Sequence, residues 1–195
     1  MPLPQKESKY TYSDYLTWPK DEMWEIIEGV PYLQAAPSWE HQRILAQIGR
    51  QFINYFQGKP CETYLAPFDV RLPIGNENDE DTETIVQPDI SIICDKSKLK
   101  GTGYFGVPTL IIEILSPSTA AFDKKIKVNK YRTAGVKEVW IIDPSNKILD
   151  VFKLLDDGKY GQPETYSAED KVVVSNFPDL IVDLSSVFES RQSKI

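Results

Sequence analysis

Two acidic residues interrupt segments of this sequence that otherwise predict buried β-strands. Asp89 lies within a run from Ile85 to Cys94, and Glu113 lies within the apolar run LIIEIL. An ionised carboxylate in an apolar strand is unfavourable unless it is paired, protonated or bound to a cation. Side chains alternate along a strand, so Asp89 would share a face with Gln87 and Ser91, and neighbouring strands would bring both carboxylates together. The pattern indicates a site for a divalent metal ion.

Each carboxylate also has an explanation that needs no metal. Asp89 follows Pro88, and a Pro-Asp pair can close a turn or cap a strand. Glu113 can instead form a buried ion pair with a lysine, and such a pair is compatible with catalysis. The residues alone leave both alternatives open.

The length and composition predict one globular domain that spans residues 1–195, with residues 1–12 as a flexible tail. The chain has 195 residues, of which 41% are hydrophobic and 11% aromatic, enough for a full core. No apolar run approaches the roughly 18 residues of a membrane span, and the first residues lack the apolar core of a signal peptide. We therefore expect a cytoplasmic protein that is not associated with a membrane.

The cysteine and histidine content limits the covalent and metal chemistry that we expect. Cys61 and Cys94 lie far apart in the sequence, with no CxxC motif, and His41 is the only histidine. These features favour neither a disulfide framework nor a Cys/His zinc site. We interpret both cysteines as buried thiols.

The charged residues are segregated along the chain. The net charge of −7 argues against a protein that wraps nucleic acid by bulk attraction. However, the segment from Lys124 to Lys137 holds six basic residues and no acid, and the segment from Glu77 to Glu83 holds five acids and no base. Without neighbouring carboxylates, the basic segment would be interpreted as a solvated helix face. The sequence predicts no role for the acidic segment.

The hydrophobic periodicity and the turn residues predict a series of helices and strands. The N-terminal part is expected to form a short helix from Ser13, a hairpin that turns at Glu28-Gly29, and a helix capped by Ser38 and ended by Gly58. Strands are expected at 64–72, 85–94 and 109–115, followed by a helix capped by Ser118 or Thr119 and ended by Gly135. A strand at 138–142, a hairpin that turns at 156–158, and a strand at 171–175 that extends or caps the sheet complete the expected elements. Pro31 predicts a sheet edge. The core order is α-β-β-β-α-β, which predicts an α/β (α+β) fold. In this fold, a mixed sheet is flanked by helices, with an N-terminal hairpin and a C-terminal β-extension.

Several distinctive sequence blocks follow one another along the chain. They are QPDISII, IIEILSPST, Asp123-x3-Lys127-x3-Tyr131-x3-Gly135-Val136 and EVWIIDP, with the weaker features WEIIEG, APS leading to His41, and FDVRL. Together with the core order, these blocks resemble the PD-(D/E)XK (restriction-endonuclease-like) nuclease superfamily. Within it, the sequence is similar to the Uma2 (Uma-two) family of restriction endonucleases, and the resemblance covers nearly the whole chain.

The resemblance implies a metal-dependent endonuclease that hydrolyses DNA phosphodiester bonds. Asp89, Glu113 and the backbone carbonyl of Ile114 would hold Mg²⁺, for which Mn²⁺ can substitute, together with water molecules. The superfamily usually carries a lysine two residues after the glutamate, but position 115 is Leu. The match to the Uma2 blocks instead assigns this catalytic role to Lys127, from the following helix.

Helix spacing favours Lys127 over the neighbouring lysines. Residues 123, 127 and 131 are spaced by four, so Asp123, Lys127 and Tyr131 share one helix face. We expect Lys127 to orient the attacking water or to stabilise developing charge, and Tyr131 to orient the lysine. The alternative is that Lys127 is a solvated charge paired with Asp123.

Further residues are expected to support this site or to bind the substrate. Glu25 and His41 are candidate supporting residues, although a lone histidine is usually structural and Glu25 could be a strand-surface carboxylate. The residues expected to contact nucleic-acid phosphates are Lys124, Lys125, Lys130 and Arg132.

Three classes of function fit the sequence. The first is the Mg²⁺-dependent endodeoxyribonuclease described above. The second is a non-catalytic nucleic-acid-binding or assembly protein on a retained nuclease fold, which the pI near 4.9 and the missing lysine at position 115 favour. The third is a glycoside hydrolase that uses Asp89 and Glu113 as an acid/base pair, but no sugar-binding aromatic residues are grouped near those strands. The apolar edge strands and the N-terminal hairpin also predict a homodimer, which would place two sites across a duplex.

Overall fold

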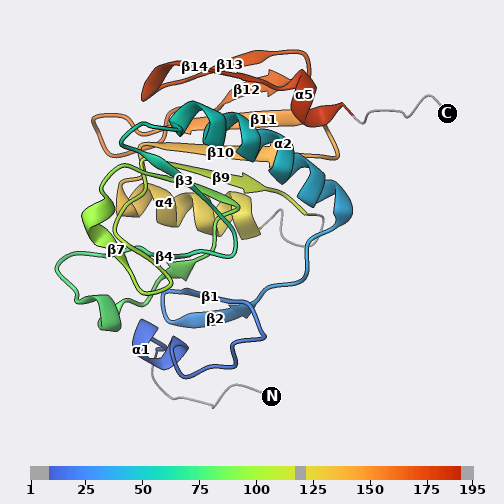
Figure 1. Cartoon of the computed structure of the whole chain (residues 1–195). Coiled ribbons are helices and arrows are strands. Elements are labelled where there is room, and N and C mark those ends of the chain that lie inside the picture. Colours follow the sequence, from blue (N-terminus) through green and yellow to red (C-terminus); the bar gives the residue numbers. More distant parts are fainter. Residues whose placement is uncertain (1–8, 117–121, 190–195) are drawn as a thin grey trace.

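The protein is built from two six-stranded sheets and a two-stranded ribbon (Figure 1). The computed structural model describes residues 9–116 and 122–189. The first sheet has the order β2-β1-β5-β4-β8-β7, and the second has the order β12-β11-β10-β9-β6-β3. The helices and helical turns are α1 (Tyr12–Tyr15), α2 (Trp39–Phe56), η1 (Asp79–Asp81), η2 (Lys96–Lys98), η3 (Asp123–Lys127), α4 (Val128–Ala134) and α5 (Ser185–Phe188). The strands are β1 (Trp24–Ile27), β2 (Val30–Leu33), β3 (Glu62–Leu65), β4 (Asp69–Arg71), β5 (Ile85–Val86), β6 (Ile90–Ile93), β7 (Leu99–Lys100), β8 (Gly103–Phe105), β9 (Leu110–Ile114), β10 (Glu138–Asp143), β11 (Ile148–Lys153), β12 (Glu164–Ser167), β13 (Lys171–Val174) and β14 (Phe177–Asp183).

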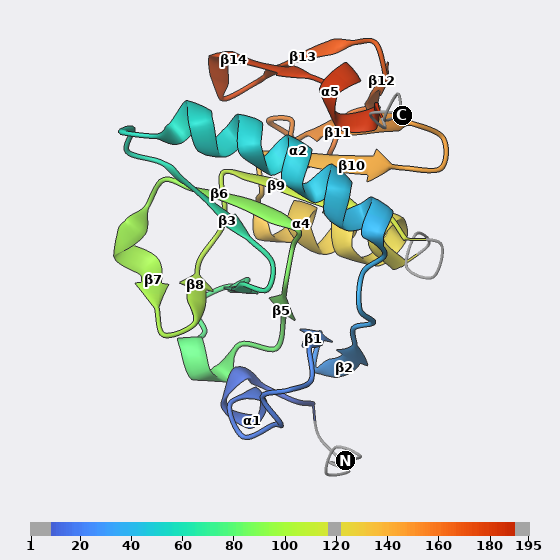
Figure 2. The same cartoon turned by 45° about the vertical axis from the view of Figure 1, so that its right-hand side comes forward.

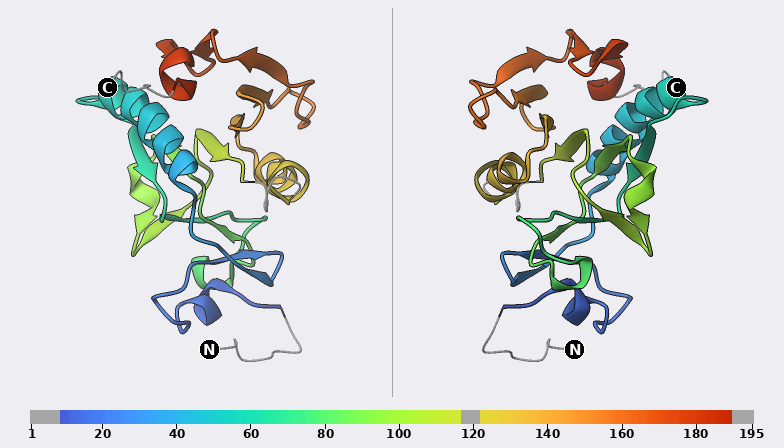
Figure 3. Two further views of the ribbon diagram at one scale, coloured as in Figure 1. Left: turned by 90° about the vertical axis from the view of Figure 1, so that its right-hand side faces the viewer. Right: turned by 90° about the vertical axis from the view of Figure 1, so that its left-hand side faces the viewer.

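The second sheet and its two flanking helices follow the predicted core order, which here is α2-β3-β6-β9-α4-β10. Strand β9 lies between β6, with which it is antiparallel, and β10, with which it is parallel. Helices α2 and α4 lie on opposite sides of this sheet (Figure 3). Alternation along β9 sends Ile112 and Ile114 toward α2, whereas Ile111 packs with Val128 and Tyr131 of α4. Glu113 therefore points to the side of the sheet that carries α4.

Local signals predicted the start of α2 and the end of α4 correctly, whereas α1 starts at Tyr12 after the cap Thr11, earlier than the predicted start at Ser13. Helix α2 starts after Ser38, whose side chain accepts a hydrogen bond from the His41 backbone N–H at 3.2 Å. Helix α4 ends at Gly135, whose φ of 88° is the left-handed conformation that glycine adopts easily. The predicted cap at Ser118 or Thr119 lies outside the described residues. The described part of that helix begins with η3, a π-helical turn that the sequence did not predict.

Two predicted strands are each divided between the two sheets. The run at 64–72 becomes β3 and β4, separated by the cis Ala66–Pro67 bond, and the run at 85–94 becomes β5 and β6, separated at Pro88. Proline has no N–H to donate to a sheet ladder, so each strand stops pairing there. Asp89 therefore lies at the junction between the sheets. The predicted continuous strand is therefore interrupted at 87–89, although Gln87 and Asp89 still line the same cavity.

The N-terminal hairpin formed by β1 and β2 lies at one end of the first sheet, as Figure 2 shows. Its turn contains Glu28 and Gly29, both with positive φ, and Pro31 lies in β2, the edge strand, as predicted. In the same region, the acidic segment is attached to the sheet. Asp79 is buried and accepts hydrogen bonds from the Arg71 guanidinium.

The cysteines form a disulfide, which corrects the interpretation as free thiols. Cys61 and Cys94 are bonded with an S–S distance of 2.08 Å. They flank the antiparallel strands β3 and β6, in which Glu62 pairs with Ile93, so the next residues along also face each other. The pairing depends on strand register, which the separation of 33 residues in the sequence does not reveal.

The C-terminal ribbon of β13 and β14 covers helix α2 and does not extend the sheet. Val172 and Val182 of the ribbon belong to the same buried cluster as Ile48 and Phe52 of α2. Of the two expected alternatives, the ribbon therefore caps the core. None of the helices within 9–116 and 122–189 combines the length and the apolar character needed to cross a bilayer.

Candidate active site

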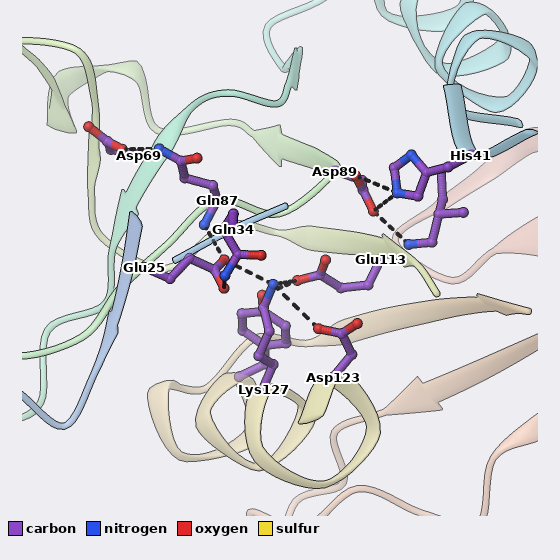
Figure 4. A network of polar contacts seen from close by, with 11 residues as sticks. Glu25, Gln34, His41, Asp69, Gln87, Asp89, Glu113, Asp123 and Lys127 are labelled. Atoms are coloured by element: carbon purple, nitrogen blue, oxygen red, sulfur yellow. Dashed lines mark hydrogen bonds and ion pairs between the residues drawn. The ribbon is translucent and has the colours of Figure 1, made fainter. Parts of the chain in front are cut away.

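Lys127 is the centre of a buried cluster of carboxylates. Its Nζ lies 2.7 Å from Glu113 Oε1, 2.9 Å from Glu25 Oε1 and 3.8 Å from Asp123 Oδ1 (Figure 4). Lys127 is only 4% exposed. The alternative that Lys127 is a solvated helix charge is therefore wrong.

Three separate elements bring these side chains together. Glu113 comes from β9, Glu25 from β1 of the N-terminal hairpin, and Asp123 and Lys127 from the turn η3. Tyr131, one turn further along in α4, donates a hydrogen bond to Glu113 Oε1. The predicted helix face is confirmed, although Tyr131 orients the glutamate directly.

Asp89 and His41 form a second pair next to this cluster. His41 Nε2 lies 3.1 Å from Asp89 Oδ1 and 3.2 Å from Oδ2, and the Ile114 backbone N–H donates to Asp89 Oδ2 at 2.7 Å. Burial lowers the pKa of His41, but the hydrogen bond and charge of Asp89 and a hydrogen bond with the Ile114 backbone outweigh it. The net result is a pKa above the usual histidine value, which favours the protonated form beside Asp89.

The two predicted carboxylates converge on one cavity. Ile90 of β6 pairs with Ile112 of β9, so extending this antiparallel register by one residue brings Asp89 opposite Glu113. The cavity has a volume of about 520 Å³. The polar and charged residues that line it are Gln34, Ser38, His41, Gln42, Gln87, Asp89, Glu113, Ser116, Asp123 and Lys127.

The cavity has more acidic than basic groups, and this excess changes the titration of Glu113. Desolvation is the largest influence and, with the charges of Asp123, Asp89 and Glu25, raises the pKa of Glu113 to about 8, although Lys127 acts in the opposite direction. Burial lowers the pKa of Lys127, but the surrounding carboxylates raise it well above its usual value. An additional cation would therefore stabilise the ionised form of Glu113.

The donor set fits Mg²⁺ better than zinc. Across residues 9–116 and 122–189, no three His, Cys, Asp or Glu side chains form a ready-made metal-binding group. A structural or catalytic zinc site needs three or four such ligands, whereas Mg²⁺ commonly takes one or two carboxylates and keeps several waters. Asp89 and Glu113 supply oxygen donors of that kind at the wall of an open cavity.

Two glutamines and one aspartate belong to the network but were not predicted as site residues. The Gln34 side chain donates to Glu25 Oε2 at 3.0 Å, and the Gln87 backbone N–H donates to Glu25 Oε1 at 2.7 Å. The Gln87 side chain also donates to Asp69 Oδ1 at 2.9 Å. Gln87 and Asp69 lie in the QPDISII and FDVRL blocks, so their place in the blocks that carry the family resemblance was the available signal.

The other basic residues of the Lys124–Lys137 segment do not join this cavity. Lys124 lies 3.6 Å from Asp150, Lys130 pairs with Glu28, and Arg132 donates to Asn129 and to the Gly158 carbonyl. Lys125 and Lys130 line a separate surface depression beside the N-terminal hairpin. The structure therefore brings only Lys127 of the basic segment to the predicted carboxylates.

Comparison with known proteins gives the context for this geometry. The chain is 28% identical over 155 residues, 78% of each chain, to slr1290, an uncharacterized protein of Synechocystis sp. (strain ATCC 27184 / PCC 6803 / Kazusa). It is 30% identical over 122 residues to sll1609, another uncharacterized protein of that organism, which corresponds to 61% of this chain and 65% of sll1609.

A solved structure shares the fold. It is the crystal structure of a "putative nuclease belonging to DUF820" from Anabaena variabilis ATCC 29413, with a TM-score of 0.75 and 18% sequence identity. The similarity covers 92% of this chain and 97% of that one. The profile of the Uma2 family, described as "Putative restriction endonuclease", matches residues 12–185. The chain therefore belongs to the Uma2 family of restriction-endonuclease-like proteins.

Proposed function

We propose that this protein is a metal-dependent endonuclease that hydrolyses DNA phosphodiester bonds at the cavity between Asp89 and Lys127. The single observation that carries the proposal is the 2.7 Å contact between Lys127 and Glu113. Through this contact, a lysine from the helix takes the place of the lysine that is missing at position 115. Membership of the Uma2 family, described as "Putative restriction endonuclease", and the fold shared with the Anabaena variabilis protein support the same conclusion.

Asp89 and Glu113, with the Ile114 backbone carbonyl, would hold Mg²⁺, and Mn²⁺ can replace it. When bound, the ion supplies a water of lowered pKa and offsets negative charge on the phosphoryl group. His41 holds Asp89 in place, and Tyr131 holds Glu113. These contacts keep both carboxylates oriented toward the cavity before substrate arrives.

Lys127 has the chemistry to orient the attacking water or to stabilise charge that develops on the phosphoryl oxygens. Glu25 and Asp123 hold its ammonium and keep it protonated, since both raise the pKa of Lys127. The cationic form is the one that stabilises an anionic transition state.

The alternative is a binding or assembly protein that has retained the nuclease fold without catalysis. The observation that favours it is the position of the Lys127 ammonium, which already lies against three carboxylates. A glycoside hydrolase is disfavoured, because no Trp, Tyr or Phe is among the described residues that line the cavity.

The test is cleavage of supercoiled plasmid and of single-stranded DNA with Mg²⁺ or Mn²⁺. Asp89→Asn and Lys127→Met should each reduce cleavage by about 100-fold or more, because each removes a group that acts on the reacting atoms. Lys124→Met is the matched control, since Lys124 belongs to the same turn but pairs with Asp150. Equal cleavage by all proteins would reject the site. Metal binding without cleavage of any substrate would favour the non-catalytic alternative.

We also propose a homodimer. Support comes from the edge strand β2, which exposes Val30 and Leu33. Sedimentation of the native protein at high concentration tests this proposal, and a monomer there would reject it.

A further inference from the structure

Trp39 is an exposed aromatic residue at the start of helix α2, next in sequence to Ser38, which lines the cavity. It is 76% exposed, whereas Trp18 and Trp140 are buried in the cores of the protein. Trp39 is the first residue of α2 and lies between Ser38 and His41, both of which line the cavity. An indole in this position is a flat apolar surface within a few residues of the catalytic groups.

Part of the cavity wall is apolar, and this part is next to the acidic residues. The apolar lining residues include Met23, Ala35, Ala36, Pro37, Leu45 and Pro67. The amide side chains of Gln34 and Gln42 also line the cavity. A nucleotide unit has the same two parts, because its phosphate is charged and its base is flat, largely apolar and able to form hydrogen bonds along its edges. A phosphate held by a metal ion at Asp89 and Glu113 would bring an adjoining base to this wall.

The electrostatics do not favour a duplex ligand. Duplex DNA is bound largely through cationic side chains that neutralise its dense phosphate charge. The chain carries a net charge of −7, and the basic side chains of Lys124 and Lys130 are engaged with Asp150 and Glu28. Stacking of a base on an aromatic ring adds affinity that does not depend on neutralising charge, but it requires a base that is not already stacked in a duplex.

We propose that Trp39 is a base-stacking platform, and that the cavity accepts an unpaired nucleic-acid strand in preference to duplex. This inference rests on the proposed function, because it assumes that the scissile phosphate binds at Asp89 and Glu113. It identifies the substrate class of that site as single-stranded nucleic acid. The base next to the bound phosphate lies along the apolar wall, with Trp39 stacking on an exposed base at the mouth.

The test is binding of a labelled single-stranded oligonucleotide and of a blunt duplex of the same length, measured by fluorescence anisotropy with Ca²⁺ in place of Mg²⁺, so that a cation remains available to the carboxylates while cleavage is suppressed. The native protein should bind the single strand more tightly. Trp39→Ala should weaken single-strand binding by about tenfold, the typical effect of losing one stacked base, and leave duplex binding unchanged. Trp39→Phe should restore most of the affinity. Oligo(dT) and oligo(U) used side by side identify which sugar the site prefers.

Ile53→Ala is the matched control. Ile53 is also an exposed apolar residue of α2, at 47% exposure, but it is near the other end of the helix from His41 and Leu45, which line the cavity. The Ile53→Ala protein should bind the single strand and the duplex as the native protein does. If Trp39→Ala weakens the binding of both ligands equally, or weakens neither, the inference is overturned.

Cleavage assays separate this inference from the proposed function. If Mg²⁺-dependent cleavage requires Asp89 but Trp39→Ala cuts single strands as fast as the native protein, the nuclease proposal stands and the stacking platform is rejected. If binding of single strands depends on Trp39 but no metal-dependent cleavage occurs, the platform stands and the nuclease proposal is rejected.

Discussion

Glu25 Oε1 lies 2.9 Å from the Nζ of Lys127, so the N-terminal hairpin is part of the buried cluster around this lysine. Both side chains are buried, and Glu25 also accepts hydrogen bonds from Gln34 and from the Gln87 backbone. Glu25 is thus held by Gln34 and the Gln87 backbone, and it contacts the Lys127 ammonium from the side opposite to strand β9. The hairpin therefore has a direct role in the geometry of the site.

The first prediction concerns this contact. Glu25→Gln should reduce metal-dependent cleavage by at least about tenfold, because the lysine would lose one of the groups that position it. It should also lower the free energy of unfolding by about 1–3 kcal/mol, since a buried ion pair and its hydrogen bonds are weakened. Thermal or urea unfolding and plasmid cleavage provide the measurements.

Glu28→Gln is the control for that prediction. Glu28 belongs to the same hairpin and also pairs with a lysine of the same helix, Lys130, but it is exposed. Exposed pairs contribute little, so Glu28→Gln should behave as the native protein. Similar losses in both variants would mean that the hairpin acts only through overall stability.

The second prediction is a pH dependence of stability without metal. Burial raises the pKa of Glu113 to about 8, so the folded protein holds this proton more tightly than the unfolded chain does. The stabilisation is complete below the pKa of the unfolded chain and is lost as the pH rises through about 8. In EDTA, the free energy of unfolding should therefore fall over this interval.

Glu113→Gln should remove this part of the pH dependence, because glutamine does not titrate. Mg²⁺ should also flatten the profile of the native protein, since a cation favours the ionised carboxylate. Chemical unfolding at several pH values, with and without Mg²⁺, measures both effects. An unchanged slope in Glu113→Gln would show that other groups cause it.

The third prediction uses the fact that His41 is the only histidine. Its pKa is raised by Asp89, so NMR titration of its ring signals should give a value above that of an unperturbed histidine. Asp89→Asn should lower the pKa of His41 clearly, and Asp123→Asn should lower it less, because Asp123 acts only through its weaker charge effect. A normal pKa in the native protein would contradict the contact.

The raised pKa of His41 also determines how this residue changes the free energy of unfolding with pH. A raised histidine pKa stabilises the folded protein at low pH, and this contribution is lost as the pH rises through the folded pKa. Mg²⁺ bound near Asp89 should lower the pKa of His41, which gives a second readout of metal binding in the same titration.

The fourth prediction concerns the disulfide. Reduction, or the double change Cys61→Ser with Cys94→Ser, should lower the free energy of unfolding by about 3–4 kcal/mol, because the bond closes a loop of 33 residues. Neither cysteine lines the cavity, so cleavage by the folded protein should not change. Parallel loss of cleavage under conditions where the reduced protein remains folded would contradict this separation.

The sequence predicted best the features that local chemistry determines. Ser38 and Gly135 mark helix ends through the conformations of their own backbones, and Glu113 was found because one acid in an apolar strand requires a partner. The order of the core elements and the position of Lys127 on a helix face toward the carboxylates were also predicted. These features depend on spacing within short segments or on blocks that recur in the family.

The features that the sequence missed depend on contacts between distant segments. Nothing local indicates that the strand through Asp89 changes sheets, because that depends on which strands pair on each side of Pro88. The bond between Cys61 and Cys94 likewise follows from register. Glu25 could be proposed only as a supporting residue, since its contact with Lys127 exists only after the first sheet meets the second.

The lysine beside Glu113 comes from a helix, and this origin determines what positions its ammonium. Leu115 occupies the position that would otherwise carry the lysine, and it is buried against the same apolar cluster as Val128 of α4. The distance between the ammonium and Glu113 is therefore fixed by the placement of a helix on a sheet, and not by the pleat of a strand. Substitutions that loosen the packing of this helix should therefore displace the ammonium, although the backbone of β9 would stay paired with β6 and β10.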